Sequence, residues 1–366
     1  MSVDTDVLRT PLCDRLGIDL PIISAGMGPI AGPDLAAAVS NAGGLGVLGC
    51  TSMTADEVRT VIRRTRELTD RPFGVDLILP ARLEQTGARM RDVADRMPRE
   101  HLDEARRIAR DLGVDAPNSG ALAGERNALG TDAEAQIAVV LEEQVPVFVG
   151  ALGTPAAFAD RLHDAGVVVM SVVGSTKQAV KVARDGADVV IAQGSEGGGH
   201  TGHVGTMALL PQVLDAVDVP VVAAGGIGDG RGLAAALVMG CQGVWVGTRF
   251  LATIESGLAQ WQKDELVAAA DQSPVISRAY TGKRFRVLPN RWTEAWANAE
   301  LDPLPMPLQP VLTGMVLGNL ATDRGGRQGV SMNGAGNIAG RVTEVLPAAT
   351  VVHRMATEAA ARLSPR

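Results

Sequence analysis

The chain has 366 residues, of which 46% are hydrophobic, 20% charged and only 3% aromatic, and its formal net charge is −7. This acidic balance argues against a nucleic-acid-binding surface, and no run of about 18 apolar residues is present that would cross a membrane. Cys13, Cys50 and Cys241 are far apart and odd in number, so they predict no metal cluster and no disulfide framework. With no signal-peptide pattern at the N-terminus, we expect a cytoplasmic protein.

Short apolar segments alternate with helix-like segments along most of the chain. A helical pattern follows the first apolar segment (residues 20–27) and ends at Asn-Ala-Gly. After the second, Thr54 and Glu57 have the spacing of a capping box at the start of a helix. Eight segments are expected to be strands: residues 20–27, 44–50, 73–79, 145–152, 166–173, 187–194, 219–227 and 243–251.

This alternation predicts an α/β fold with a parallel sheet, and eight units in roughly 250 residues are typical of a (β/α)8 TIM barrel. The aliphatic composition agrees, because parallel strands are buried on both faces. An open doubly wound sheet is the alternative, although no GxGxxG turn follows the first strand.

Two segments interrupt the barrel pattern. Residues 80–144 are predicted to be a charged helical insertion after strand 3, either simply solvated or serving as a cover or an oligomer contact. Residues 255–330 are irregular and proline-rich, and we expect an inserted lid or substrate segment between strand 8 and the final helix. The barrel domain then comprises residues 1–254 and 331–366, and its last helix lies within residues 346–363.

Glycines gather where strands are expected to end, which is where barrels bind ligands. The sequences AAGGIGDG (residues 223–230) and VGTRF (residues 246–250) follow the seventh and eighth strands. Exposed backbone N–H groups at such loops favour a phosphate-bearing ligand, and Thr248 adds a hydroxyl. The alternative is that these glycines only close tight turns.

The glycine-rich sequence QGSEGGGHTGHVG (residues 193–205) follows the sixth strand and contains two histidines. His200 is the candidate acid–base group, because an imidazole gives or takes a proton near neutral pH. His203 is the competitor and would otherwise face solvent. Glu196 is expected either to orient His200 or to be exposed.

The sequences QGSEGGGHTG, AAGGIGDGRGLAAALVMGCQGVWVGTRFLAT and SAGMGPIAGPDLAAAVSNAGGLGVLG resemble the nitronate monooxygenase family, formerly called 2-nitropropane dioxygenases. Members of that family are FMN-dependent TIM-barrel enzymes. The sequence GGGHTG followed by TMALLPQV is also similar to flavin-dependent enoyl-acyl-carrier-protein reductases and to acyl-CoA-acting flavin oxidoreductases.

The resemblance implies a set of cofactor contacts around the catalytic His200. Asp76 stands where relatives commonly have asparagine, and Asn337 stands where they have glutamine. An acid beside a flavin ring disfavours its anionic reduced form unless the acid is protonated or paired. The implied FMN-binding residues are Gly26, Met27, Asp76, Gln193, Gly198, Gly199, Ala224, Gly225, Gly226, Gly247, Thr248, Gly336 and Asn337.

The expected function is FMN-dependent oxidation of alkyl nitronates or nitroalkanes by O₂, with His200 as the base. The alternative is an NAD(P)H-dependent reductase or dehydrogenase acting on an enoyl or acyl-CoA/ACP thioester or a quinone, with His200 as proton donor. A flavin-binding module without catalytic activity is a third class. The expected partner is a small-molecule substrate, and a homo-oligomer is left open.

Overall fold

Eight parallel strands form one sheet in the computed structural model, which describes residues 5–79, 93–114, 132–318 and 329–364. The order of the strands is β1-β9-β8-β6-β5-β4-β3-β2. Every strand lies within one of the eight segments expected from the sequence. Their bounds are β1 (Ile22–Ser24), β2 (Gly46–Gly49), β3 (Phe73–Ile78), β4 (Val147–Ala151), β5 (Val168–Val173), β6 (Val189–Gln193), β8 (Val221–Ala224) and β9 (Gly243–Val246).

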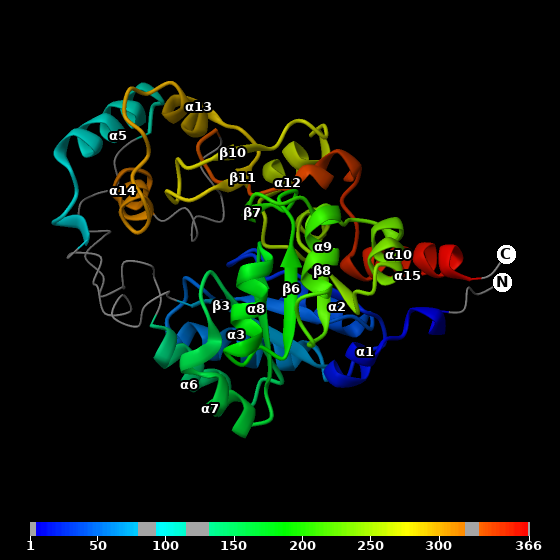
Figure 1. The fold of residues 1–366 in the computed structure, drawn as a ribbon. Helices are drawn as coiled ribbons and strands as arrows, with labels where there is room; N and C mark the ends of the chain where they lie inside the picture. The colour runs from blue at the N-terminus through cyan, green and yellow to red at the C-terminus, as the bar shows by residue number, and fades with distance from the viewer. Residues whose placement is uncertain (1–4, 80–92, 115–131, 319–328, 365–366) are drawn as a thin grey trace.

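The sheet closes on itself between β1 and β2. Ile23 and Leu45 form a parallel bridge, in which Ser24 N donates to Leu45 O at 2.9 Å and Leu45 N donates to Ile22 O at 2.9 Å. On its other side β1 pairs with β9, beginning with Ile22 opposite Val244. The predicted (β/α)8 barrel is therefore confirmed, and the open doubly wound alternative is wrong (Figure 1).

A helix separates each strand of the barrel from the next. Thr54 and Glu57 form the expected capping box at the start of α3, with Thr54 N donating to Glu57 Oε2 at 2.7 Å. The final helix, α15, packs on α10 and α2 as the sequence predicts. Among the described helices, none is long and apolar enough to cross a membrane. The barrel helices are α2 (Pro33–Asn41), α3 (Ala55–Leu68), α6 (Ala133–Glu142), α7 (Ala159–Asp164), α8 (Thr176–Arg184), α9 (Thr206–Leu214), α10 (Gly230–Val238) and α15 (Ala348–Leu363).

A short helix, α1 (Pro11–Leu16), covers the end of the barrel where the strands begin. Leu12, Cys13 and Leu16 are buried in one cluster with aliphatic side chains of the strands. Thr10 Oγ1 also donates to Gln242 O, directly before β9, at 2.7 Å. Because this end is covered, a ligand reaches the barrel from the opposite end, where the strands finish.

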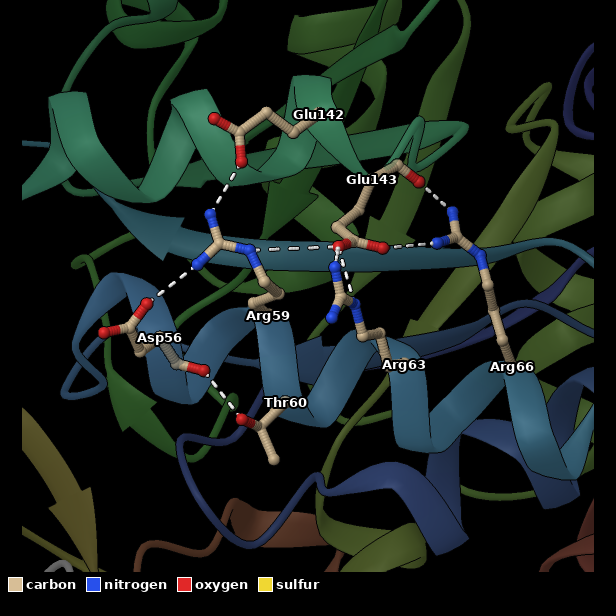
Figure 2. A network of polar contacts seen from close by, with 7 residues as sticks. All are labelled: Asp56, Arg59, Thr60, Arg63, Arg66, Glu142 and Glu143. Atoms are coloured by element: carbon tan, nitrogen blue, oxygen red, sulfur yellow. Dashed lines mark hydrogen bonds and ion pairs between the residues drawn. The ribbon is translucent and has the colours of Figure 1, made fainter.

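The charged 80–144 segment contributes helices to two different parts of the molecule. α6 packs on α3 and β3 as the barrel helix before β4, and an arginine–glutamate network joins α3 to the end of α6 (Figure 2). In that network Glu143 contacts Arg63 and Arg66, each at 2.9 Å, while Arg59 contacts Glu142 at 2.6 Å. The other described helix, α5 (Arg99–Asp111), packs instead on α13 (Arg291–Ala297) and α14 (Leu308–Leu317) (Figure 1).

The 255–330 segment forms its own small layer over the barrel. Its core includes Trp292 and Trp296, whose rings pack edge to face with centroids 6.0 Å apart. An antiparallel sheet of three short strands, absent from the sequence prediction, joins this segment to the barrel. This sheet contains β10 (Val275–Ser277), β11 (Phe285–Val287) and β7 (Gly199–His200).

The other short elements of the described chain are η1 (Asp6–Leu8), η4 (Pro155–Ala157), α11 (Thr248–Leu251), α12 (Gln260–Val267) and η5 (Asn337–Arg341).

Candidate functional site

A cavity of about 1370 Å³ lies where the barrel strands end, beneath the 255–330 segment. Its volume exceeds the roughly 300–1,000 Å³ of ordinary small-molecule sites, so it has room for two ligands side by side. Eleven of the fourteen residues that the sequence places at the site line this cavity: Gly26, Met27, Asp76, Gln193, Gly198, Gly199, His200, Gly225, Gly226, Gly247 and Thr248.

His200 is held at the cavity wall by contacts on three sides. Its backbone lies opposite Phe285 in the small sheet, and Gln193 Nε2 donates to His200 O at 2.7 Å. The imidazole packs edge to face on the Phe285 ring, with centroids 5.1 Å apart. Its Nε2 lies 3.1 Å from Thr281 Oγ1. The ring orientation is therefore fixed by residues about eighty positions further along the chain.

The surroundings of His200 favour the uncharged imidazole. Burial and, to a smaller extent, the positive charge of Lys283 together lower the pKa of His200 to about 4. Glu196 does not orient the ring, as one reading of the sequence proposed. Its carboxylate instead accepts hydrogen bonds from the Thr206 amide at 2.9 Å and from the Thr206 hydroxyl at 2.9 Å, at the start of α9. His203 is exposed and is not part of the cavity wall.

Asp76 is a buried carboxyl within β3, only 8% exposed. Its Oδ1 has no hydrogen-bond partner among the described residues, and burial raises the pKa of Asp76 to about 8. The acid is therefore mostly protonated at neutral pH, so it is uncharged as an asparagine side chain would be. Gly26 makes room for it, because a Cβ at Gly26 would lie 2.3 Å from Asp76 Oδ2.

The glycines after β8 and β9 adopt conformations that leave backbone at the cavity wall. Gly225 and Gly226 have φ angles of 92° and 73°, a region that glycine enters without strain. Gly247 and Thr248 follow β9. The Thr248 hydroxyl accepts a hydrogen bond from Gly336 N at 2.9 Å, so it ties the C-terminal segment to this loop.

Three predicted cofactor residues do not line the cavity. Ala224 is 1% exposed within β8. Gly336 packs behind the glycine-rich loop, where a Cβ would lie 2.4 Å from Glu196 O. The side chain of Asn337 points elsewhere and donates to Asp271 O at 3.2 Å.

The sequence prediction missed the turn between β10 and β11. Thr281, Lys283, Arg284 and Phe285 of this turn and strand lie close to His200 or line the cavity with it. The one sequence signal was the pair of basic residues after Thr-Gly, but its proximity to residues 193–205 depends on long-range strand pairing. Within the described residues, no group of three or more His, Cys, Asp or Glu side chains gathers as metal ligands would.

Comparisons with known proteins agree with this architecture. A nitroalkane oxidase structure from Streptomyces ansochromogenes is 34% identical with a TM-score of 0.81, covering 96% of this chain and 98% of that one. The structure of FabK from Thermotoga maritima is 32% identical with a TM-score of 0.73, covering 96% of each chain.

Curated relatives carry two kinds of name. A Rhodococcus jostii protein named (3aS,4S,5R,7aS)-5-hydroxy-7a-methyl-1-oxo-octahydro-1H-indene-4-carboxyl-CoA dehydrogenase is 41% identical over 77% of this chain, and the match spans 66% of that relative's length. A Staphylococcus aureus protein named "Probable nitronate monooxygenase" is 32% identical over 84% of this chain and 86% of its own. The profile of the nitronate monooxygenase family matches residues 9–358. The chain belongs to the nitronate monooxygenase family.

Proposed function

We propose that this chain oxidises alkyl nitronates, and the nitroalkanes from which they form, with O₂ and bound FMN. The observation that carries the proposal is an uncharged His200 at the wall of a large cavity, fixed by Thr281 and without a carboxylate partner among the described residues. Membership of the nitronate monooxygenase family supports the proposal. FMN would supply the redox chemistry, accepting electrons from the substrate and passing them to O₂.

The residues present fit such a cofactor. Backbone N–H groups at Gly225, Gly226 and Gly247 would hold the phosphate, since they lie at the cavity wall where barrels often bind phosphate. The unpartnered Asp76 would meet the flavin ring edge near Gly26 as a neutral carboxyl group. As a neutral group, Asp76 removes the electrostatic objection that an ionised acid would raise against a reduced, anionic ring.

His200 would accept the proton of a neutral nitroalkane. With Nε2–H donating to the Thr281 hydroxyl, the lone pair lies on Nδ1, which we assign as the proton acceptor. A pKa of about 4 makes the free imidazole a weak base. The negative charge that forms on the substrate would then stabilise the imidazolium. A nitronate that arrives already ionised needs no such step, so we expect it to react faster than its parent nitroalkane.

The 255–330 segment is proposed to cover the substrate end of the cavity. Ser256, Leu258 and Gln262 line the cavity from one side, and Lys283 and Phe285 line it near His200. These side chains would exclude bulk water from the reacting atoms, which strengthens electrostatic interactions there.

The test is anaerobic mixing of the purified, FMN-loaded protein with ethyl nitronate, nitroethane, NADH or NADPH. We expect ethyl nitronate to bleach the flavin absorbance fastest. His200→Asn should keep its flavin and lose nitroethane oxidation, whereas His203→Asn serves as the matched control because that side chain is exposed. Bleaching by a nicotinamide alone, or wild-type nitroethane rates in His200→Asn, would contradict the proposal.

A second candidate is a flavin oxidoreductase that acts on an acyl-CoA thioester. The cavity of about 1370 Å³ is larger than a small nitronate and a flavin require together. Two relatives, 41% and 39% identical, are named as dehydrogenases of a carboxyl-CoA. An uncharged His200 suits removal of a proton from such a substrate better than donation to it. Bleaching of the flavin by an acyl-CoA or by NADPH, and not by ethyl nitronate, would favour this candidate.

A further inference from the structure

We propose that Lys283 and Arg284 form a binding site for the anionic group of the substrate, beside His200 at the cavity wall. This inference rests on the proposed function and adds the substrate class, which is an oxyanion. The charge would belong either to a nitronate or to the phosphates of a CoA thioester.

The turn that carries the two cations is tied firmly to the loop of the catalytic candidate. Thr281 Oγ1 lies 3.1 Å from His200 Nε2, and Thr201 N donates to Arg284 O at 3.3 Å. At the centre of the turn, Arg278 Nε donates to Gly282 O at 3.2 Å. The backbone that carries both cations is therefore placed before a ligand arrives, which lowers the entropic cost of binding.

Neither cation has an acidic partner in the described part of the chain. No carboxylate there lies within ion-pair distance of Lys283 or Arg284. The Nε of Arg284 is buried and has no hydrogen-bond partner among those residues. Leaving a buried guanidinium nitrogen without an acceptor is costly, and an incoming oxyanion would remove that cost.

Other buried cations nearby show the contrast. Arg286, two residues further along, donates to Ser195 O at 3.0 Å and to Pro274 O at 3.3 Å. Lys263 donates to Ser256 O at 3.1 Å. Both of these cations donate hydrogen bonds to backbone carbonyl groups, whereas Arg284 lines the cavity with its Nε unpaired.

Four acids line the cavity, Asp34, Glu57, Asp76 and Glu255, and two of them accept hydrogen bonds from backbone at the start of a helix. Glu57 accepts a hydrogen bond from Thr54 N at 2.7 Å in the capping box of α3. Glu255 accepts one from Ala348 N at 2.9 Å at the start of α15. Among the described residues, none of these acids forms an ion pair with Lys283 or Arg284, so both cations beside His200 keep their charge in a chain whose net charge is −7.

The charge of Lys283 also acts on His200, where it helps to lower the pKa of the imidazole. A field that disfavours a proton on the ring favours an anion in the same place. Anionic substrates, and neutral ones that become anions on losing a proton, would therefore be bound and stabilised there.

The test measures equilibrium binding by anaerobic calorimetry to the protein loaded with reduced FMN, because ethyl nitronate would reduce the oxidised flavin during the titration. The probes are ethyl nitronate, butanoyl-CoA and butanoyl-pantetheine, the last of which lacks the phosphates. In Lys283→Ala/Arg284→Ala we expect the Kd of an anionic probe to rise by about tenfold or more, because hydrogen bonds to charged groups are lost. The Kd of butanoyl-pantetheine should stay unchanged.

The control Lys177→Ala/Arg110→Ala removes the same charge from exposed residues that do not line the cavity, and Lys283→Arg/Arg284→Lys should retain most of the affinity. Flavin content and circular dichroism verify the fold. If the double variant is misfolded, Lys283→Ala alone provides the test, because that side chain is exposed.

The choice of probes distinguishes a nitronate group from CoA phosphates as the anion that is bound. An effect on ethyl nitronate identifies the small anion, and an effect on butanoyl-CoA identifies the phosphates. Unchanged Kd values for both anions, or no binding of either to the wild type, would overturn the proposal. Failure of the proposed function is distinct, because anionic probes would then still bind through Lys283 and Arg284 while ethyl nitronate left the flavin unbleached.

Discussion

The imidazole Nε2 of His200 lies 3.1 Å from the hydroxyl of Thr281, a residue of the turn between β10 and β11. The proposed base therefore comes from the barrel, while the residue that fixes its ring comes from the segment above it. This arrangement makes Thr281 a positioning residue, since it acts on the substrate only through His200.

Thr281→Val removes the hydroxyl with little change of shape, so the ring loses its anchor. We expect kcat with nitroethane to fall about tenfold, the equivalent of one hydrogen bond, with little change in KM. Thr281→Ser keeps the hydroxyl and should restore most of the rate. Steady-state kinetics and flavin content measure this, and a wild-type kcat in the valine variant would rule the positioning role out.

Lys283→Met should move the acid limb of the pH profile. A base must be unprotonated, so kcat/KM for nitroethane should fall as pH drops through the pKa of His200, about 4. Lys283 is the one charged group that acts on the ring in the described residues, and removing it raises that pKa toward the ordinary value near 6.5. The limb should therefore shift to higher pH. A limb at the same pH in both proteins would contradict this assignment.

Asp76→Asn should raise stability increasingly as pH rises. Burial raises the pKa of Asp76 to about 8 in the folded protein, against 3.8 for an ordinary Asp. Between these values the folded carboxyl keeps a proton that the unfolded one loses, so the contribution of Asp76 to stability falls with rising pH. Asparagine has no such proton to lose.

Urea unfolding at pH 5 and pH 8 measures the difference between the Asp76→Asn variant and the wild type. We expect the variant to gain more than about 1.4 kcal/mol relative to the wild type over this range, the value of a tenfold change in a protonation equilibrium. If the difference in the free energy of unfolding between variant and wild type is the same at both pH values, Asp76 ionises in the folded protein at its ordinary pKa.

Gly336→Ala should displace the glycine-rich loop that lines the cavity, because Gly336 packs against the side of that loop away from the cavity. The new Cβ would lie 2.4 Å from Glu196 O and 2.9 Å from Gly198 N, so the glycine-rich loop must shift. We expect a loss of about 1–3 kcal/mol in stability, typical of overpacking, and weaker FMN binding. Gly314→Ala in α14 is the matched control, because a Cβ there meets nothing within 4 Å. Equal behaviour of the two variants would count against this reading.

Glu143→Gln should weaken the contact between α3 and α6 without affecting the cavity. Glu143 contacts both Arg63 and Arg66 at 2.9 Å (Figure 2), and its side chain is only 10% exposed. We expect a loss of about 1 kcal/mol, at the upper end for surface ion pairs, and the loss should shrink in high salt. Thermal unfolding at two salt concentrations measures it, and a salt-independent loss would point to packing instead.

Sequence reasoning predicted the barrel because its signals are local. Thr54 and Glu57 lie three residues apart and form the expected capping box, and short aliphatic segments alternate with helical ones along the chain. The small sheet was missed because its strands have two or three residues each, too short for a periodic pattern. Its register depends on His200 meeting Phe285, which only the folded chain determines.

The candidate site was also predicted only in part from the sequence. Residues directly after strands, such as Gly225 after β8 and Gly247 after β9, line the cavity because the strand ends of a barrel meet at one face. Asn337 was inferred from its place in a motif, and its side chain instead binds Asp271 O. Lys283 and Arg284 were not found, because nothing local indicates that their turn lies over residues 193–205.

The two-residue strand β7 belongs at once to the loop that leaves the barrel and to the sheet of the covering segment. Any movement of β11 away from the barrel must pull on β7, and with it the backbone of His200. A ligand that separated β11 from the barrel would therefore also displace the proposed base, although it contacted none of the glycines after β8 and β9.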